Sequence, residues 1–273
     1  MTNSRTVHSI IFIIILGSLY SCGSSDVQKV LTAEERFDAG KKKFSDGDYL
    51  EAIAEFEIVT LQFPGSAVAD DAQFYVGESH FQREEYLLGA EAYQTLRRNF
   101  QSSPLASLAQ YKTALCYYNL APKSSLEQKY TLRAIDELQS FIEYNPKDTL
   151  VADAAAKIKE LDTRLAKKLY DTAVLYTKME YYKSAALYYS TVVDKYHDTQ
   201  YAEPGLLGLV KTLVTRNKYD EAKQYIDKYF EKYPNGSMKG EAESLRDDIG
   251  NHLKSKSADI GLHTPGVFIV QTS

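Results

Sequence analysis

YLEAIAEF occupies residues 49–56, and YLLGAEAY occupies residues 86–93, 37 positions further along the chain (from 49 to 86). Each segment opens on Tyr-Leu, carries small residues in its middle and closes on an aromatic residue. The same shift relates three sets of residues of similar size: Phe37, Phe74 and Tyr111; Gly40, Gly77 and Ala114; Phe44, Phe81 and Tyr118. A fixed period of this length is the signature of a repeat architecture, in which each unit packs mainly on its neighbours.

The second half of this pattern recurs three more times along the chain. The copies lie at residues 134–146, 185–197 and 222–234. Polar segments such as residues 45–48 (Ser-Asp-Gly-Asp) separate two amphipathic stretches within a unit, and Pro64, Pro146 or Pro234 closes a unit, because proline cannot continue a helix. The sequence therefore predicts an all-α fold of about five helix-turn-helix units.

The spacing of the units is not uniform. An insertion near residues 122–125 lengthens the loop inside the third unit, and residues 151–165 form an uninterrupted helical pattern. We therefore expect units 1–3 over residues 33–150, and a linking helix with units 4–5 over residues 151–253. After residue 253 the periodicity is lost, so residues 254–273 are predicted to form a flexible tail.

The first 21 residues have the organisation of a secretory signal. Arg5 precedes an apolar run at residues 10–19, which is too short to span a bilayer. The next residues, Leu19-Tyr20-Ser21-Cys22, resemble a bacterial lipobox, whose cysteine receives diacylglycerol and becomes the new N-terminus. We expect lipidation at Cys22 and a short tether over residues 22–32; the alternative is an ordinary signal peptide with an incidental cysteine.

The composition argues against several classes of function. A formal net charge of -5 is unlike the basic footprint of a nucleic-acid-binding protein. None of the five histidines pairs with another ligand at metal-binding spacing, and there is neither a glycine-rich phosphate loop nor a nucleophile elbow. Beyond Cys22 the chain has only Cys116, predicted to be a buried, inert thiol. We expect no catalytic residue, metal, cofactor or small-molecule substrate.

The units resemble the tetratricopeptide repeat, with small residues early in both helices and a proline at the end. In the first unit these places are taken by Gly40, Ala52 and Pro64, and the resemblance covers residues 33–253. It implies a superhelix whose first helices line an inner face, where repeat proteins bind extended partners.

The inner face supplies candidate protein-binding residues, most of them aromatic. They are Phe37, Lys41, Phe44, Phe74, Phe81, Tyr111 and Tyr118. The alternative is that these rings form the core between repeats, since aromatic stripes at helical spacing usually pack inside. We expect Phe44→Ala with Phe81→Ala to weaken partner binding without unfolding the protein, whereas a loss of helicity would identify both rings as core.

The combination of lipobox, tether and five degenerate repeats resembles the BamD family of outer membrane assembly lipoproteins. Aromatic stretches that end in Tyr-Pro, such as residues 229–234, are similar to that family too. The resemblance implies a lipid-anchored scaffold of the β-barrel assembly (BAM) complex, on the periplasmic face of the outer membrane. The C-terminal repeats would bind a BamA-type barrel protein through its POTRA domains, and the N-terminal repeats would receive unfolded outer membrane proteins.

Two other binding functions remain as alternatives. One is a periplasmic tetratricopeptide factor that coordinates peptidoglycan synthesis with envelope constriction, although such proteins usually carry a coiled coil in place of a lipid. The other is a surface lipoprotein that captures glycans, which generally needs tryptophan for sugar stacking, and this chain has no Trp.

Overall fold

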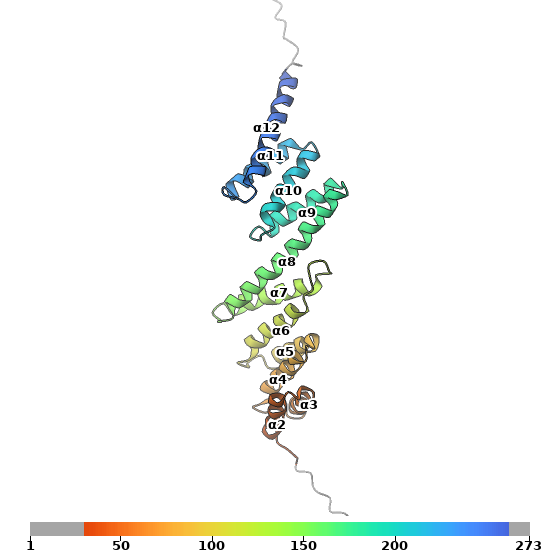
Figure 1. The fold of residues 1–273 in the computed structure, drawn as a ribbon. Helices are drawn as coiled ribbons and strands as arrows, with labels where there is room; N and C mark the ends of the chain where they lie inside the picture. Colours follow the sequence, from red (N-terminus) through yellow and green to blue (C-terminus); the bar gives the residue numbers. More distant parts are fainter. Residues whose placement is uncertain (1–29, 262–273) are drawn as a thin grey trace, which may run out of the picture.

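The computed structural model describes residues 30–261, with side chains up to residue 256. Every regular element in this part of the chain is an α-helix. The helices are α2 (Ala33–Asp46), α3 (Tyr49–Gln62), α4 (Ala69–Gln82), α5 (Tyr86–Asn99), α6 (Ala106–Leu120), α7 (Lys129–Tyr144), α8 (Val151–Lys178), α9 (Tyr182–Lys195), α10 (Ala202–Thr215), α11 (Tyr219–Lys232) and α12 (Lys239–Gly261). They stack in chain order along one axis, with α2 near one end and α12 at the other (Figure 1). This is the predicted tetratricopeptide-repeat superhelix, with five pairs of first and second helices.

A left-handed residue makes the turn between first and second helices in four of the five units. Gly47 has a φ of 85°, and Glu84, 37 positions later, has a φ of 59°. Glu180 and Asn217, again 37 positions apart, have φ values of 61° and 55°. Only glycine adopts this backbone at no cost, so three of these turns carry local strain. In the third unit the longer loop between α6 and α7 replaces the tight turn.

Inside a unit the two helices approach most closely where the first helix has glycine. A Cβ atom added to Gly40 would lie 2.6 Å from the ring of Phe56, and one added to Gly77 would lie 2.6 Å from the ring of Tyr93. Both rings are fully buried. The ring of the second helix therefore rests on the bare backbone of the first, which explains why the 37-residue shift preserves these glycines.

Helix α8 departs from the regular repeat, with 28 residues where most helices have 14. As far as Leu165 it packs on α7, through Leu161 and Leu165. Its second half packs on α9 through Tyr170 and Ala173. At about 1.5 Å per residue it is about 42 Å long, and one rigid rod therefore carries two separate cores. We call α2–α7 the N-terminal arm and α9–α12 the C-terminal arm.

The inserted loop of the third unit is fastened to α8. Arg164 donates hydrogen bonds to the carbonyl oxygens of Ala121, at 2.8 Å, and Pro122, at 3.1 Å. Lys168 donates to the carbonyl oxygen of Leu126 at 2.6 Å. These bonds satisfy carbonyl groups just after the end of α6, so the two irregular features of the sequence, loop and long helix, support each other.

The first and last described helices show how the ordered stack begins and ends. A capping box of Thr32 and Glu35 begins α2 at Ala33. Helix α12 packs on α10 and α11 through the buried Ala242 and Ile249 and extends to Gly261, into the stretch that the sequence predicts to be a tail. Cys22 lies outside the described residues. Within them, no helix is long and apolar enough to cross a membrane.

Candidate protein-binding surfaces

Three of the predicted inner-face residues gather around Tyr75 of α4. The ring centroids of Phe37 and Phe44 lie 6.0 Å and 5.3 Å from that of Tyr75, and the ammonium of Lys41 lies 3.7 Å from it. Lys41 also donates a hydrogen bond to the Tyr75 hydroxyl. Tyr75 is absent from the residues predicted for the inner face, because its register partners, Asp38 and Lys112, are not aromatic. All four side chains are half-buried, so their edges reach solvent.

Two of the predicted residues belong to the core. Phe74 is 8% exposed and packs on Tyr93, and Tyr111 is 6% exposed and packs on Phe141. The hydroxyl of Tyr111 donates to Asp153, and burial is the largest of the effects that raise its pKa. Each of these two rings packs on a ring of the second helix of its own unit, as in the alternative interpretation of the aromatic residues as core.

Phe81 and Tyr118 are half-buried in the remaining part of the same face. Phe81 packs edge-on against Tyr86, and the ammonium of Lys112 lies 5.2 Å from its centroid. The Tyr118 hydroxyl donates to Glu160 at 2.5 Å, and this hydrogen bond is the largest of the effects that raise its pKa to about 12. These contacts fix both rings in place while leaving part of each exposed.

Polar contacts link successive first helices along this face. Lys41 joins α2 to Tyr75 in α4, Glu78 of α4 lies 2.7 Å from Lys112 of α6, and Tyr118 joins α6 to α8. The polar atoms of the face are thus paired within the chain. The part of this face that is open to a partner is the row of partly exposed aromatic rings, which these contacts hold in place.

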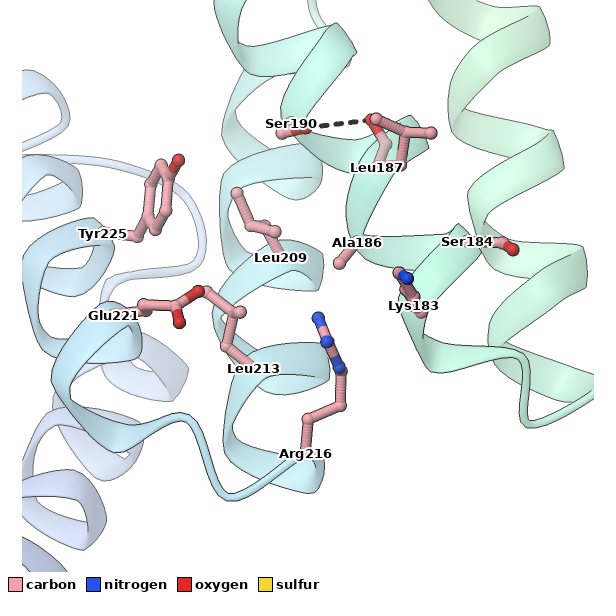
Figure 2. Close-up of a pocket in the computed structure, with 10 residues that line it drawn as sticks. All are labelled: Lys183, Ser184, Ala186, Leu187, Ser190, Leu209, Leu213, Arg216, Glu221 and Tyr225. Carbon is pink, nitrogen blue, oxygen red and sulfur yellow. Dashed lines mark hydrogen bonds between the residues drawn. The ribbon is translucent and has the colours of Figure 1, made fainter.

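A second candidate surface lies in the C-terminal arm, between the second helices α9 and α11 (Figure 2). Buried Ala186, Leu209 and Leu213 form its floor, and Leu187 at its rim is 65% exposed. The hollow has a volume of about 420 Å³, enough for a few side chains. We call this hollow the α9–α11 groove.

Two cations of the α9–α11 groove lack a compensating acid. Figure 2 shows the guanidinium of Arg216 pointing into the groove and Lys183 on the α9 side, with Glu221 and Tyr225 across the groove on α11. Within residues 30–256, neither side chain makes an ion pair or a side-chain hydrogen bond, and the one carboxylate of the groove, Glu221, is 3.1 Å from Lys218. An apolar floor beside uncompensated positive charge fits an apolar side chain next to a carboxylate.

The N-terminal arm has a related hollow in the corresponding place, between α5 and α7, with Leu87, Tyr117 and Leu132 among its lining residues. Its charged residues are two acids and two bases: Glu127, Asp136, Lys129 and Arg133. Arg133 is bonded to Glu137 at 2.8 Å. We call this hollow the α5–α7 groove; it lies in the corresponding place, has a volume of about 660 Å³ and carries a balanced charge.

The described residues supply no group of three His, Cys, Asp or Glu side chains close enough to hold a metal ion. Cys116 is free and fully buried, and burial is the largest of the effects that raise the pKa of its thiol to about 12. A thiol with so high a pKa is neither a nucleophile nor a ligand at neutral pH.

Comparison with known proteins identifies a family and several relatives. The model of the family YfiO, described as outer membrane lipoprotein, matches residues 30–213, more than half of the chain. The outer membrane protein assembly factor BamD of Caulobacter vibrioides is 23% identical over 225 residues, which are 81% of this chain and 74% of that protein. BamD of Haemophilus influenzae is 22% identical over 216 residues, 74% of this chain and 81% of that protein.

Solved structures that align with the chain include other tetratricopeptide-repeat proteins. The TPR2AB domain of yeast Sti1 covers 80% of this chain and 98% of its own, with a TM-score of 0.42 and 12% identity. A thermophilic repeat protein of Thermus thermophilus covers 81% of this chain and 99% of its own, with a TM-score of 0.33 and 14% identity.

Proposed function

The chain belongs to the YfiO family of outer membrane lipoproteins, and we propose that it is a scaffold subunit of the complex that assembles β-barrel proteins into the outer membrane. Its relatives named above are outer membrane protein assembly factors, which supports a role of that general kind. The partners are proposed from the two surfaces described.

The C-terminal arm is proposed to hold a BamA-type barrel protein through a POTRA domain. The observation that carries this is the pair of uncompensated cations, Lys183 and Arg216, beside the apolar floor of the α9–α11 groove. A partner that supplies a carboxylate to the half-buried guanidinium of Arg216 gains binding free energy, since charge-assisted hydrogen bonds are stronger than neutral ones. The exposed Leu187 would be covered in the same event.

The N-terminal arm is proposed to hold unfolded barrel segments weakly. The aromatic edges of Phe37, Phe44 and Phe81 offer apolar area in a row of about two units' length, without fixed hydrogen-bond partners to select a sequence. Because Phe44 and Phe81 also pack on Tyr75 and Tyr86, the double alanine variant must be tested for helicity together with binding.

The lipid anchor at Cys22 is proposed to keep the protein at the periplasmic face of the outer membrane. Several acyl chains, each CH₂ contributing about 0.8 kcal/mol, would make a stable attachment. The substitution Cys22→Ser should move the protein from the membrane fraction to the soluble periplasmic fraction, and a variant that stays with the membrane would rule out lipid as the main anchor.

Affinity purification from detergent-solubilised envelopes tests the proposed partner. The tagged full-length protein should recover a POTRA-containing barrel protein in near-stoichiometric amount, identified by mass spectrometry. The double variant Lys183→Glu, Arg216→Glu should reduce this recovery tenfold or more, which corresponds to about 1.4 kcal/mol.

The matched control changes the charges of the α5–α7 groove in the same way. Lys129→Glu with Arg133→Glu should leave recovery of the barrel protein within twofold of the unmodified chain. Recovery of peptidoglycan enzymes without any barrel protein would overturn the proposed function. Equal losses in both double variants would overturn the assignment of the partner to the α9–α11 groove.

A further inference from the structure

The second half of α8, residues 166–178, is the first helix of the fourth unit and is less covered than the first helix of the fifth. Helix α10 packs on both α9 and α11 and buries eight of its 14 residues. Residues 166–178 bury two, Ala166 and Ala173, and pack on α9. Helix α7 precedes α8 as α9 precedes α10, but it packs on the part of α8 up to Leu165. In the described chain, one face of residues 166–178 is therefore left without a helix beside it.

This open face continues the face of α8 that α7 covers. Leu161 and Leu165 pack on α7. Leu175 follows Leu161 by 14 residues, and since about four turns of a helix take this many residues, it lies on the same side. Met179, which caps the end of α8, follows Leu165 by the same interval. The side chains of Leu175 and Met179 are 55% and 51% exposed, so the apolar stripe that holds α7 continues into solvent.

Aromatic rings widen this stripe towards α9. Tyr176 stacks on Tyr188 of α9 with centroids 5.4 Å apart, and its centroid lies 6.2 Å from that of Tyr181. Tyr181 is 57% exposed, as is Leu126 in the loop that Lys168 fastens to the other end of the stripe. A row of exposed apolar side chains on one surface is typical of an interaction site. We call the surface formed by Leu126, Leu175, Tyr176, Met179 and Tyr181 the α8 face.

The charge beside the α8 face is positive. Lys168 donates to a backbone carbonyl and Lys178 is exposed, and within residues 30–256 neither makes an ion pair. The one acid of residues 166–178, Asp171, is 2.8 Å from Lys167. Glu180 in the following turn is a single acid against the two cations. A partner with acidic residues beside its apolar ones therefore complements this surface.

The shape of the α8 face fits a helix. Packed helices lie with their axes about 8–10 Å apart, and α7 shows that this side of α8 accepts a neighbour of that kind. From residue 168 to residue 179 the face is about 17 Å long, or about three helical turns. The backbone groups inside α8 are bonded within the helix, so a strand would find no row of free groups to pair with. Contact therefore depends on side chains, as it does between α7 and α8.

We propose that the α8 face binds an amphipathic helix of a partner protein, about three turns long, in line with α7. The apolar stripe of that helix covers Leu175 and Met179, and its acidic residues lie beside Lys168 and Lys178. The α9–α11 groove, with Leu187 at its rim, lies on a different side of α9, so one chain has room for both partners. The binding of this helix does not rest on the proposed function.

A synthetic helix tests the site on the full-length protein. The probe is a fluorescent, side-chain-bridged helical peptide with leucines at alternating spacings of four and three residues and glutamates on both sides of them. Fluorescence anisotropy should show saturable binding, and Leu175→Glu with Met179→Glu should weaken it tenfold or more. The matched control is Leu50→Glu with Leu61→Glu, at two exposed leucines of α3, which should keep the affinity within twofold.

A second peptide, with lysine in place of every glutamate, tests the charge. It should bind the unmodified protein several-fold more weakly than the acidic peptide does. Lys178→Glu should remove most of this difference, and because the side chain is exposed this variant keeps its fold. Equal affinities of the two peptides for the unmodified protein would overturn the acidic partner.

Photo-crosslinking in intact cells tests the natural partner. A photoreactive amino acid in place of Leu175 should crosslink a segment whose apolar residues recur at three and four residues with acidic residues among them, identified by tandem mass spectrometry. The control position is Ala156, which is exposed in the first half of α8 and should give little product.

Four outcomes would overturn the proposal, whether or not a barrel protein is recovered with the chain. They are a yield at position 175 no higher than at position 156, a crosslinked segment without acidic residues, a crosslink to a second copy of this chain, and a failure of the acidic peptide to bind. Peptide binding that survives Leu175→Glu with Met179→Glu and is lost with Leu187→Glu would assign the peptide to the α9–α11 groove and would overturn it as well.

Discussion

The grooves of the two arms share a geometry and differ in charge. The α5–α7 groove and the α9–α11 groove each lie between consecutive second helices, over the first helix of the later unit, with an exposed leucine at the rim. In the N-terminal arm the charged residues are balanced, and Arg133 is paired with Glu137. In the C-terminal arm Arg216 and Lys183 have no acid to pair with in the described part of the chain.

The difference in charge between the two grooves shows that helix packing and partner recognition depend on different residues. Both hollows arise because two second helices flank a first helix in the stacked pairs, and this arrangement occurs in both arms. The charged side chains at the rim are free to vary because they contribute little to packing. We therefore expect a few rim residues of one groove to select the partner, while the helix pairs beneath the groove are similar in both arms.

The largest expected effect comes from breaking α8 between the arms. Lys167→Pro removes a hydrogen bond and kinks the helix at an exposed position, at a cost of about 3 kcal/mol or more. Urea unfolding followed by circular dichroism should then separate into two transitions, one for each arm. Lys167→Ala should unfold in one transition, with a free energy within about 0.5 kcal/mol of the unmodified protein. A single transition in the proline variant would contradict the division into two cores.

The next effect tests the close contact inside a unit of the N-terminal arm. Gly77→Ala places a methyl group 2.6 Å from the ring of Tyr93, which is fully buried and has no room to move. The free energy of unfolding should fall by about 1–3 kcal/mol. Gly240→Ala in α12, where no atom lies within 4 Å of the new methyl group, should be neutral or slightly stabilising. Equal changes in the free energy of unfolding at the two glycines would show that the contact with the Tyr93 ring is not what destabilises the Gly77→Ala variant.

A smaller and opposite effect is expected at the strained turns. Glu84→Gly in the N-terminal arm and Glu180→Gly in the C-terminal arm should each stabilise the protein by about 1 kcal/mol, because glycine adopts their positive φ without strain. Gly47→Ala should destabilise it by a similar amount. Thermal unfolding of the three variants measures this, and stabilisation in one arm only would show that the turns are not equivalent.

The smallest effect depends on pH and is confined to the N-terminal arm. A hydrogen bond from Arg83, followed by one with His80, lowers the pKa of Glu85 to about 2. The stabilisation from this carboxylate is present above about pH 4.5 and is lost as the pH falls from there towards 2, since the protonated group loses its partners. The urea midpoint of Glu85→Gln should fall less than that of the unmodified protein over this range. The exposed Glu91 serves as control, and Glu91→Gln should follow the unmodified protein.

The repeat period predicted the architecture because the core itself is periodic. Gly40 and Gly77, and likewise Ala185 and Ala222, are buried pairs that lie 37 positions apart. The sequence also predicted the long loop of the third unit and the helical stretch that continues as α8. Helix α12 continues to Gly261, beyond residue 253, where the sequence shows no further repeat periodicity.

The binding surfaces were harder to predict, for two physical reasons. Tyr75 lies between Phe37 and Phe44 in space but breaks the aromatic register, so only the structure shows that it organises the inner face. The α9–α11 groove is assembled from three helices, and whether Arg216 finds an acid depends on side-chain positions that a one-dimensional pattern does not contain. The repeat period predicts which residues pack in the core. Which polar side chains remain unpaired, and so can bind a partner, is shown only by the structure.

Site-specific photo-crosslinking in intact cells tests the central claim, that the C-terminal arm holds the barrel-protein partner. A photoreactive amino acid replaces either Leu187 in the α9–α11 groove or Leu132 in the α5–α7 groove, both exposed. Crosslinking of a POTRA-containing barrel protein at position 187, with little or none at position 132, is the predicted result. Crosslinking of that protein at position 132 and not at position 187 would contradict the account.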